Sequence, residues 1–171
     1  NENYFVSVST SRALVEHRLF EKSTYFPLSP FELNKKSIVK EFFVHQESKF
    51  KDEKDRVVYA LKYTPKTKTS FHFYGKAWID STSGNLLKVE LNSDSTSVSP
   101  FIPLFPGDRL KKTAFKISKT FELEGDKMYV KSIDFKYELV YSSERQGEYT
   151  VQSNAVLYAY NYQEQFLLPF Y

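Results

Sequence analysis

Residues 71–91, FHFYGKAWIDSTSGNLLKVEL, decide the fold class of this chain. Apolar side chains recur at every second position on both sides of a polar centre, at Phe71, Phe73, Ala77 and Ile79 and again at Leu87, Val89 and Leu91. The centre, Asp80–Asn85, consists of residues that favour turns. Period-two alternation interrupted by a turn is typical of two paired strands. The stretch therefore predicts a β-hairpin.

The same rhythm continues on both sides of the hairpin. Before it, Tyr59, Leu61 and Tyr63 alternate with Ala60 and Lys62. Pro65 is expected to end this strand, because it has no backbone N–H to donate to a neighbouring strand. After it come three further runs, separated by short polar turns: Phe115, Ile117, Phe121 and Leu123; Ile133, Phe135, Tyr137, Leu139 and Tyr141; and Tyr149, Val151, Ala155, Leu157 and Ala159. This succession predicts an antiparallel meander. The residues that we expect to point into its core are Phe73, Ile79, Val89, Phe135 and Leu139.

Length and composition favour a single, mainly β domain over residues 1–171. The 16 Phe, 13 Tyr and 1 Trp favour pleated strands. The absence of Cys excludes disulfides, zinc–thiolate sites and cysteine nucleophiles. The net charge of +3, from 24 basic and 21 acidic residues, is too balanced to indicate a nucleic-acid binder. No apolar run approaches the roughly 20 residues that a membrane-spanning helix needs.

The first 50 residues contain weaker and conflicting patterns. Alternation at residues 4–8 suggests a short strand, whereas Ser11 is placed to cap a helix that runs to about residue 20. Residues 29–32, SPFE, resemble a capping box with proline at the first helical position. Ile38–Phe50 fits a helix or a strand, and we favour a strand because a charged turn leads directly into the next strand. We expect one or two short helices near the N-terminus.

The sequence contains no pattern of a catalytic or metal site. His17, His45 and His72 lack the spacing of a metal-binding motif, and the acidic residues are scattered among lysines, as in solvated turns. Glycine-rich phosphate loops and the nucleophile motif G-x-S-x-G are absent. We expect no enzyme activity, no catalytic residue, no metal and no cofactor. A hydrolase on an unfamiliar scaffold is the least favoured function.

Two strands carry large side chains on the side that should be polar. These residues are Tyr74 and Trp78 in the hairpin and Val156, Tyr158, Tyr160 and Tyr162 in the last strand. Large aromatic side chains on this face should be covered by another part of the chain, a partner or a ligand. We favour cover by the N-terminal segment, and the alternative is a ligand cavity or an aromatic platform.

Residues 100–108, PFIPLFPGD, form an apolar loop. Three prolines bar regular structure, yet the loop contains the large side chains Phe101, Ile102, Leu104 and Phe105. Leaving all four in water is unfavourable. We favour a plug over one end of the sheet, and the alternative is a lid on an apolar cavity or a contact with a membrane or partner. The tail at residues 166–171, FLLPFY, poses the same choice.

Four segments of the chain resemble one family. They are PLSP at 27–30, VYALKYTPK at 58–66, FYGKAWID at 73–80 and LKVE at 87–90. Together they are similar to a β-rich region of uncharacterised Bacteroidetes cell-envelope proteins, which often follows a carboxypeptidase-regulatory-like domain. The resemblance implies a curved antiparallel half-barrel like that of the lipoprotein carrier LolA, which wraps helices around an apolar cavity. It carries over no catalytic residue, and Gly75 is interpreted as a point of bending or close backbone approach.

The resemblance implies a non-enzymatic domain of the cell envelope, periplasmic, outer-membrane-associated or secreted. We expect it to bind an apolar ligand, such as a lipid or lipoprotein, or an envelope protein. The alternative is a carbohydrate-binding module whose exposed aromatic side chains stack on sugars. The candidate surface residues are Tyr74, Trp78, Tyr158, Tyr160, Phe101, Ile102, Leu104 and Phe105. We expect neither a nucleic-acid partner nor a transmembrane helix.

Overall fold

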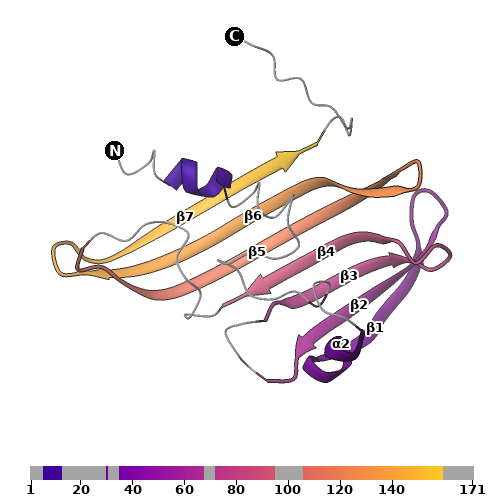
Figure 1. Cartoon of the computed structure of the whole chain (residues 1–171), viewed down its shortest axis with the longest axis horizontal. Coiled ribbons are helices and arrows are strands. Elements are labelled where there is room, and N and C mark those ends of the chain that lie inside the picture. The colour runs from indigo at the N-terminus through magenta and orange to yellow at the C-terminus, as the bar shows by residue number, and fades with distance from the viewer. Residues whose placement is uncertain (1–5, 13–29, 31–34, 68–71, 95–105, 160–171) are drawn as a thin grey trace, which may run out of the picture.

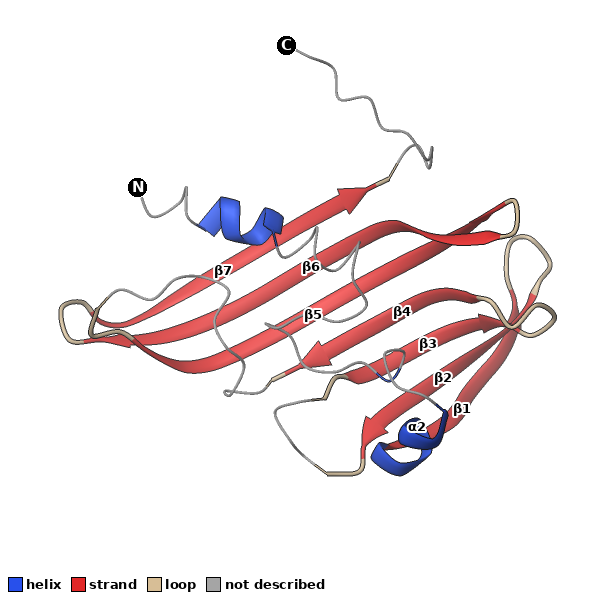
Figure 2. Cartoon of the chain, viewed as in Figure 1, coloured by secondary structure: helices blue, strands red, loops and turns tan. Residues whose placement is uncertain are grey.

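The computed structural model describes residues 6–12, 30, 35–67, 72–94 and 106–159 of a mainly β protein (Figures 1 and 2). Its strands form one seven-stranded antiparallel sheet in which the spatial order equals the chain order. They are β1 (Phe42–Lys51), β2 (Val57–Pro65), β3 (Tyr74–Asp80), β4 (Leu86–Ser93), β5 (Arg109–Glu124), β6 (Lys127–Ser143) and β7 (Gly147–Tyr158). The sheet is curved and unclosed (Figure 1). The predicted half-barrel meander is confirmed, and β3 and β4 form the predicted hairpin.

One face of the sheet, the core face, buries alternate residues of the central strands. Ile133, Phe135 and Leu139 of β6 are completely buried, as is Ile117 of β5. Leu91, Ile117 and Phe135 lie opposite one another across three strands, so the apolar side chains form continuous rows. This is the outcome that period-two alternation predicts when one face is covered.

The predicted core residues are placed as expected, with two local departures. Phe73, Val89, Phe135 and Leu139 are buried, while Ile79 is only half-buried. Leu123 was expected on the core side, but it is 53% exposed because it lies at the end of β5, beside the turn into β6. On β2, the buried Val58 and Ala60 belong to the opposite face, where Ala60 lies beside Trp78.

A short helix at residues 6–12 packs on the core face. Val6 contacts the core cluster, and the Thr10 hydroxyl lies 2.7 Å from the hydroxyl of Tyr137 while donating to the carbonyl of Val6. The strand expected at residues 4–8 is therefore wrong for Val6 and Val8, since three alternating positions are too few to outweigh a helical cover for an apolar sheet face. Ser11 lies within this helical stretch rather than at its N-cap, and residues 13–20 lie outside the described residues.

The second helix, α2 (Lys35–Glu41), corrects the prediction for Ile38–Phe50. The chain is helical as far as Glu41 and enters β1 at Phe42. Phe42 is 2% exposed, and its ring meets those of Tyr63 and His72 edge-on at 6.1 and 5.3 Å. The burial of Phe42 against Tyr63 and His72 marks where the strand begins. The sequence did not show this boundary, because a short apolar run alone does not distinguish a helix from a strand. The capping box expected at residues 29–32 lies outside the described residues except for Pro30.

Gly75 is required by the close approach of β3 and β4. A Cβ atom at this position would lie 1.9 Å from the carbonyl oxygen of Glu90 and 2.9 Å from the hydroxyl of Tyr63. The same Tyr63 hydroxyl donates a hydrogen bond to the Glu90 carbonyl. Of the two expectations for Gly75, close backbone approach is the one observed.

Candidate functional site

The face opposite the core, the open face, brings together aromatic residues that are far apart in the sequence. The strand register places Trp78, Lys88, Thr120, Ser132 and Tyr158 in one row across β3 to β7. Four strand spacings separate Trp78 from Tyr158, a distance of about 19 Å. We call this set the aromatic row. The two ends of the row are therefore too far apart to stack on a single ring of a bound molecule.

The two ends of the aromatic row differ in accessibility. Tyr158 is 60% exposed, whereas Trp78 is half-buried and its ring lies under the Lys88 ammonium, 4.7 Å from the ring centroid. Lys88 is also bound to Glu90 at 2.8 Å. Between the ends, the hydroxyls of Thr120 and Ser132 are 2.6 Å apart. The row therefore offers one exposed aromatic ring, one partly covered ring and polar groups between them.

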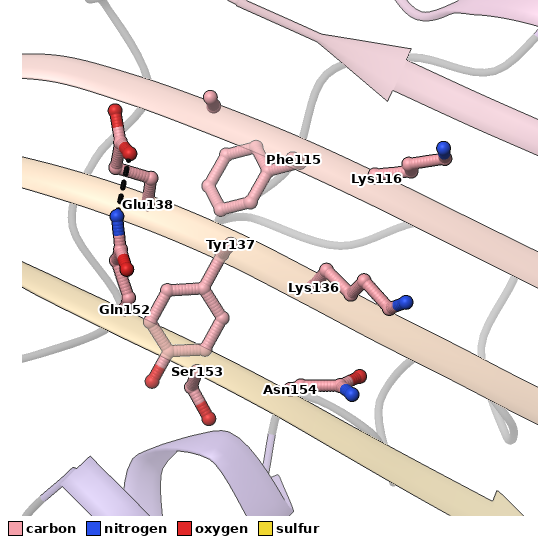
Figure 3. A pocket seen from close by; sticks show the side chains of 9 residues that line it. Phe115, Lys116, Lys136, Tyr137, Glu138, Gln152, Ser153 and Asn154 are labelled. Carbon is pink, nitrogen blue, oxygen red and sulfur yellow. Dashed lines mark hydrogen bonds between the residues drawn. The ribbon is translucent and has the colours of Figure 1, made fainter.

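A second row crosses the open face four positions away along each strand. It consists of Tyr74, Asn92, Lys116, Lys136 and Asn154, which lie opposite one another in register. An open depression of about 470 Å³ lies on β5, β6 and β7, and Lys116, Lys136 and Asn154 line one side of it (Figure 3). On the other side, Glu138 accepts a hydrogen bond from Gln152 at 2.8 Å and pairs with Lys112 at 3.1 Å. Those two donors lower the pKa of Glu138.

A third exposed surface lies at the β1 edge of the sheet. Four large apolar side chains of α2 and β1 are exposed: Val39, Phe43, Val44 and Phe50, at 65, 60, 47 and 42%. Phe43 and Val44 are consecutive strand residues, so their side chains point to opposite faces of this sheet edge. The Lys66 ammonium lies over the Phe43 ring and donates to the carbonyl of Val39 at 2.7 Å. We call these four residues the β1 edge surface. Sequence reasoning did not select them, although the unbroken apolar run Phe42–Val44 breaks the alternation and was a detectable signal.

The predicted surface residues are only partly within the described residues. Tyr74 is 40% exposed and shares the open face with Trp78 and Tyr158. Tyr160 and the loop residues Phe101, Ile102, Leu104 and Phe105 lie outside the described residues, as does Tyr162. The helix at residues 6–12, part of the segment expected to cover the aromatic side chains, packs on the core face instead.

The described residues hold no group of three or more His, Asp or Glu side chains arranged to bind a metal ion. Among the described helices, none combines the length and apolar character needed to cross a membrane.

No protein-family model, curated protein or solved structure matches this chain. The three exposed surfaces are therefore the candidate binding sites of this chain.

Proposed function

We propose that this chain is a non-enzymatic domain of the cell envelope that binds a protein partner through the β1 edge surface. The observation that carries the proposal is the concentration of exposed apolar side chains. Of the nine large hydrophobic residues exposed among the described residues, four belong to α2 and β1. Apolar side chains exposed along one sheet edge, on both faces of its strand, favour a protein contact over solvent. The periplasmic, outer-membrane-associated or secreted location rests on the sequence resemblance.

The edge of the sheet supports a partner that adds an extended segment to β1. Among the described strands, β1 pairs only with β2, so its other edge presents backbone groups for pairing. The register shift between Gln46 and Ser48 and the charges of Lys49 and Lys51 blunt the second half of the strand. The docking segment is therefore Phe42–Gln46, with the side chains of Phe43 and Val44 as anchors.

Site-directed photo-crosslinking tests this proposal. A benzophenone amino acid replaces Phe43 in the protein produced in its native cells, and the matched control places it at Leu123, which is also exposed. We expect a discrete adduct from position 43 and none from position 123, and loss of that adduct when Val44→Asp is added. Equal adducts from both positions, or none from position 43, would contradict the proposal.

An apolar ligand remains the alternative within the same class of function. Around Phe135 the core face is packed with aromatic side chains, with the Phe115 and Phe135 rings stacked at 6.2 Å and the rings of Phe135 and Tyr137 at 5.2 Å. This packing favours a protein partner over a ligand between those strands. Native mass spectrometry of the purified protein distinguishes the two, because a retained lipid adds its mass to the folded chain.

A carbohydrate is the second candidate, and the aromatic row favours it. A glycan lying across the strands would reach Trp78 and Tyr158 at its ends and the Thr120 and Ser132 hydroxyls between them. Trp78 is the single tryptophan of the chain, so its fluorescence reports on this row directly. We expect a saturable fluorescence change with a recognised glycan, weakened by Tyr158→Ala but not by Phe43→Ala. An unchanged signal over a broad glycan panel would remove this candidate.

A further inference from the structure

Two lysines of the open face differ from their neighbours in lacking a counter-charge. Lys76, Lys88 and Lys112 each pair with a carboxylate, Glu47, Glu90 and Glu138 respectively, at 2.5, 2.8 and 3.1 Å. Lys116 and Lys136 are exposed, lie directly opposite each other on β5 and β6, and have no carboxylate partner among the described residues. Like charges directly opposite each other on a sheet are unfavourable. The pair is therefore a concentrated positive charge that an anion would relieve.

The residues on both sides of the pair extend it with neutral hydrogen-bond donors. Asn92 lies opposite Lys116 and Asn154 lies opposite Lys136, so one row reads Asn, Lys, Lys, Asn across four strands. The Asn92 amide makes only a 3.4 Å contact with the Tyr74 carbonyl, and Asn154 is exposed. We call Asn92, Lys116, Lys136 and Asn154 the lysine row. It offers ammonium and amide donors and contains no carboxylate.

The surroundings restrict where an anion can bind. Asp134 and Glu138 lie two positions from Lys136 on the same face of β6, and Glu90 lies two positions from Asn92 on β4. Glu138 is engaged by Lys112 and Gln152, and Glu90 is engaged by Lys88. These carboxylates disfavour a long polyanion spread along the strands. A compact anion placed directly over the two lysines avoids them.

We propose that the lysine row binds a phosphate group. A phosphate monoester carries a charge of about −1.5 to −2 at pH 7, which matches two ammonium groups whose strands are about 5 Å apart. Lysine binds phosphate as a point charge, and an open depression admits a phosphate carried on a larger molecule (Figure 3). The same chemistry is supplied by soluble phosphoryl compounds and by lipid headgroups. The site lies on β4 to β7, away from the β1 edge surface, and does not depend on the protein-binding proposal.

The first experiment is a titration of the isotope-labelled protein with inorganic phosphate at constant ionic strength, followed by two-dimensional amide NMR. We expect saturable shifts centred on residues 116, 136 and 154. In the double variant Lys116→Gln, Lys136→Gln the apparent affinity should fall at least tenfold. The matched control, Lys54→Gln with Lys111→Gln, removes the same charge from two exposed lysines outside the row and should retain the wild-type shifts.

Vesicle flotation separates the two sources of phosphate. Vesicles of phosphatidylcholine with phosphatidylglycerol are compared with vesicles of phosphatidylcholine alone. Flotation that requires phosphatidylglycerol and is lost only in the lysine-row variant assigns a lipid headgroup, while phosphate shifts without flotation assign a soluble phosphoryl ligand. The proposal is overturned by equal losses in the row variant and its control, or by the absence of both saturable shifts and flotation. Phe43→Asp should leave both readouts unchanged, which separates this site from the β1 edge surface.

Discussion

The core face and the open face are built from alternate residues of the same strands, yet they differ in burial and in polarity. On β6, Phe135 is completely buried while the adjacent Lys136 is exposed, and on β5 the buried Ile117 follows the exposed Lys116. Since side chains of a strand point alternately to opposite faces, a shift of one residue exchanges the two environments. Stability is therefore concentrated on one face, which leaves the other free to carry recognition groups.

The largest effect should come from truncating the core face. Phe135→Ala removes a completely buried ring that stacks on Phe115, and should lower the free energy of unfolding by about 3–5 kcal/mol. Lys136→Ala, one residue away, should change it by less than about 0.5 kcal/mol, as for other surface positions. Urea titrations of both variants provide the measurement. Similar losses in the two variants would mean that the faces are not energetically distinct.

The next largest effect is expected where two strands approach most closely. Gly75→Ala places a Cβ atom 1.9 Å from the Glu90 carbonyl oxygen, and this backbone atom can move only with its strand. We expect a loss of about 1–3 kcal/mol, typical of an overpacked interior. Gly84→Ala serves as a comparison for the φ angle alone, because Gly84 has a φ of 73° and no neighbouring atom within 4 Å of a Cβ. A smaller loss for Gly75→Ala than for Gly84→Ala would contradict the steric argument.

An alkaline titration separates buried polar groups from exposed ones. Burial, and to a lesser extent the charge of Glu90, raises the pKa of Tyr63 well above its ordinary value of 10.0. The unfolded chain therefore releases this proton before the folded protein does. The stabilisation that this pKa difference gives the folded protein is complete below pH 10. Above pH 10 the free energy of unfolding falls by about 1.4 kcal/mol per pH unit.

Comparison with Tyr63→Phe isolates this contribution. The variant loses the hydrogen bond to Glu90, worth about 1 kcal/mol at neutral pH. Its stability should then fall less steeply than that of the wild type between pH 10 and 11. Parallel curves in denaturant titrations across this range would show that Tyr63 ionises as readily in the folded protein as in the unfolded chain.

The smallest effect should have the opposite sign. Lys136→Gln relieves the repulsion from Lys116 and should raise the free energy of unfolding by about 0.2–0.5 kcal/mol at low salt. The gain should diminish as the ionic strength increases, because the two charges are exposed and screened. Thermal unfolding at several chloride concentrations checks this. A destabilised variant would mean that Lys136 contributes more through its packing than through its charge.

Much of the fold could be predicted because local alternation and sheet register describe the same periodicity. The hairpin of β3 and β4, the order of the later strands and the inward direction of Phe135 and Leu139 all follow from residues that are close in sequence. The N-terminal region was predicted less well. Its helix at residues 6–12 and the helical start of Ile38–Phe50 depend on distant contacts, with Tyr137 in one case and Tyr63 in the other.

The candidate sites were less accessible to sequence reasoning than the fold. Tyr74, Trp78 and Tyr158 were identified as facing away from the core, but their grouping required the register of five strands. The opposed pair of Lys116 and Lys136 required the same register, because 20 positions separate the two residues in the chain. The β1 edge surface was missed since an exposed edge is a property of the sheet order.

By itself, the sequence determined that this chain forms antiparallel strands, which of their residues are apolar on one side, and where most of the turns fall. The reason is that side-chain alternation and turn propensity are local properties. Only the tertiary structure decided which strands are edges, which side chains share a row, and which face the N-terminal helix covers. Those outcomes depend on pairings between residues far apart in the chain. The partner and register of each strand are determined by the burial of apolar side chains over the complete core face.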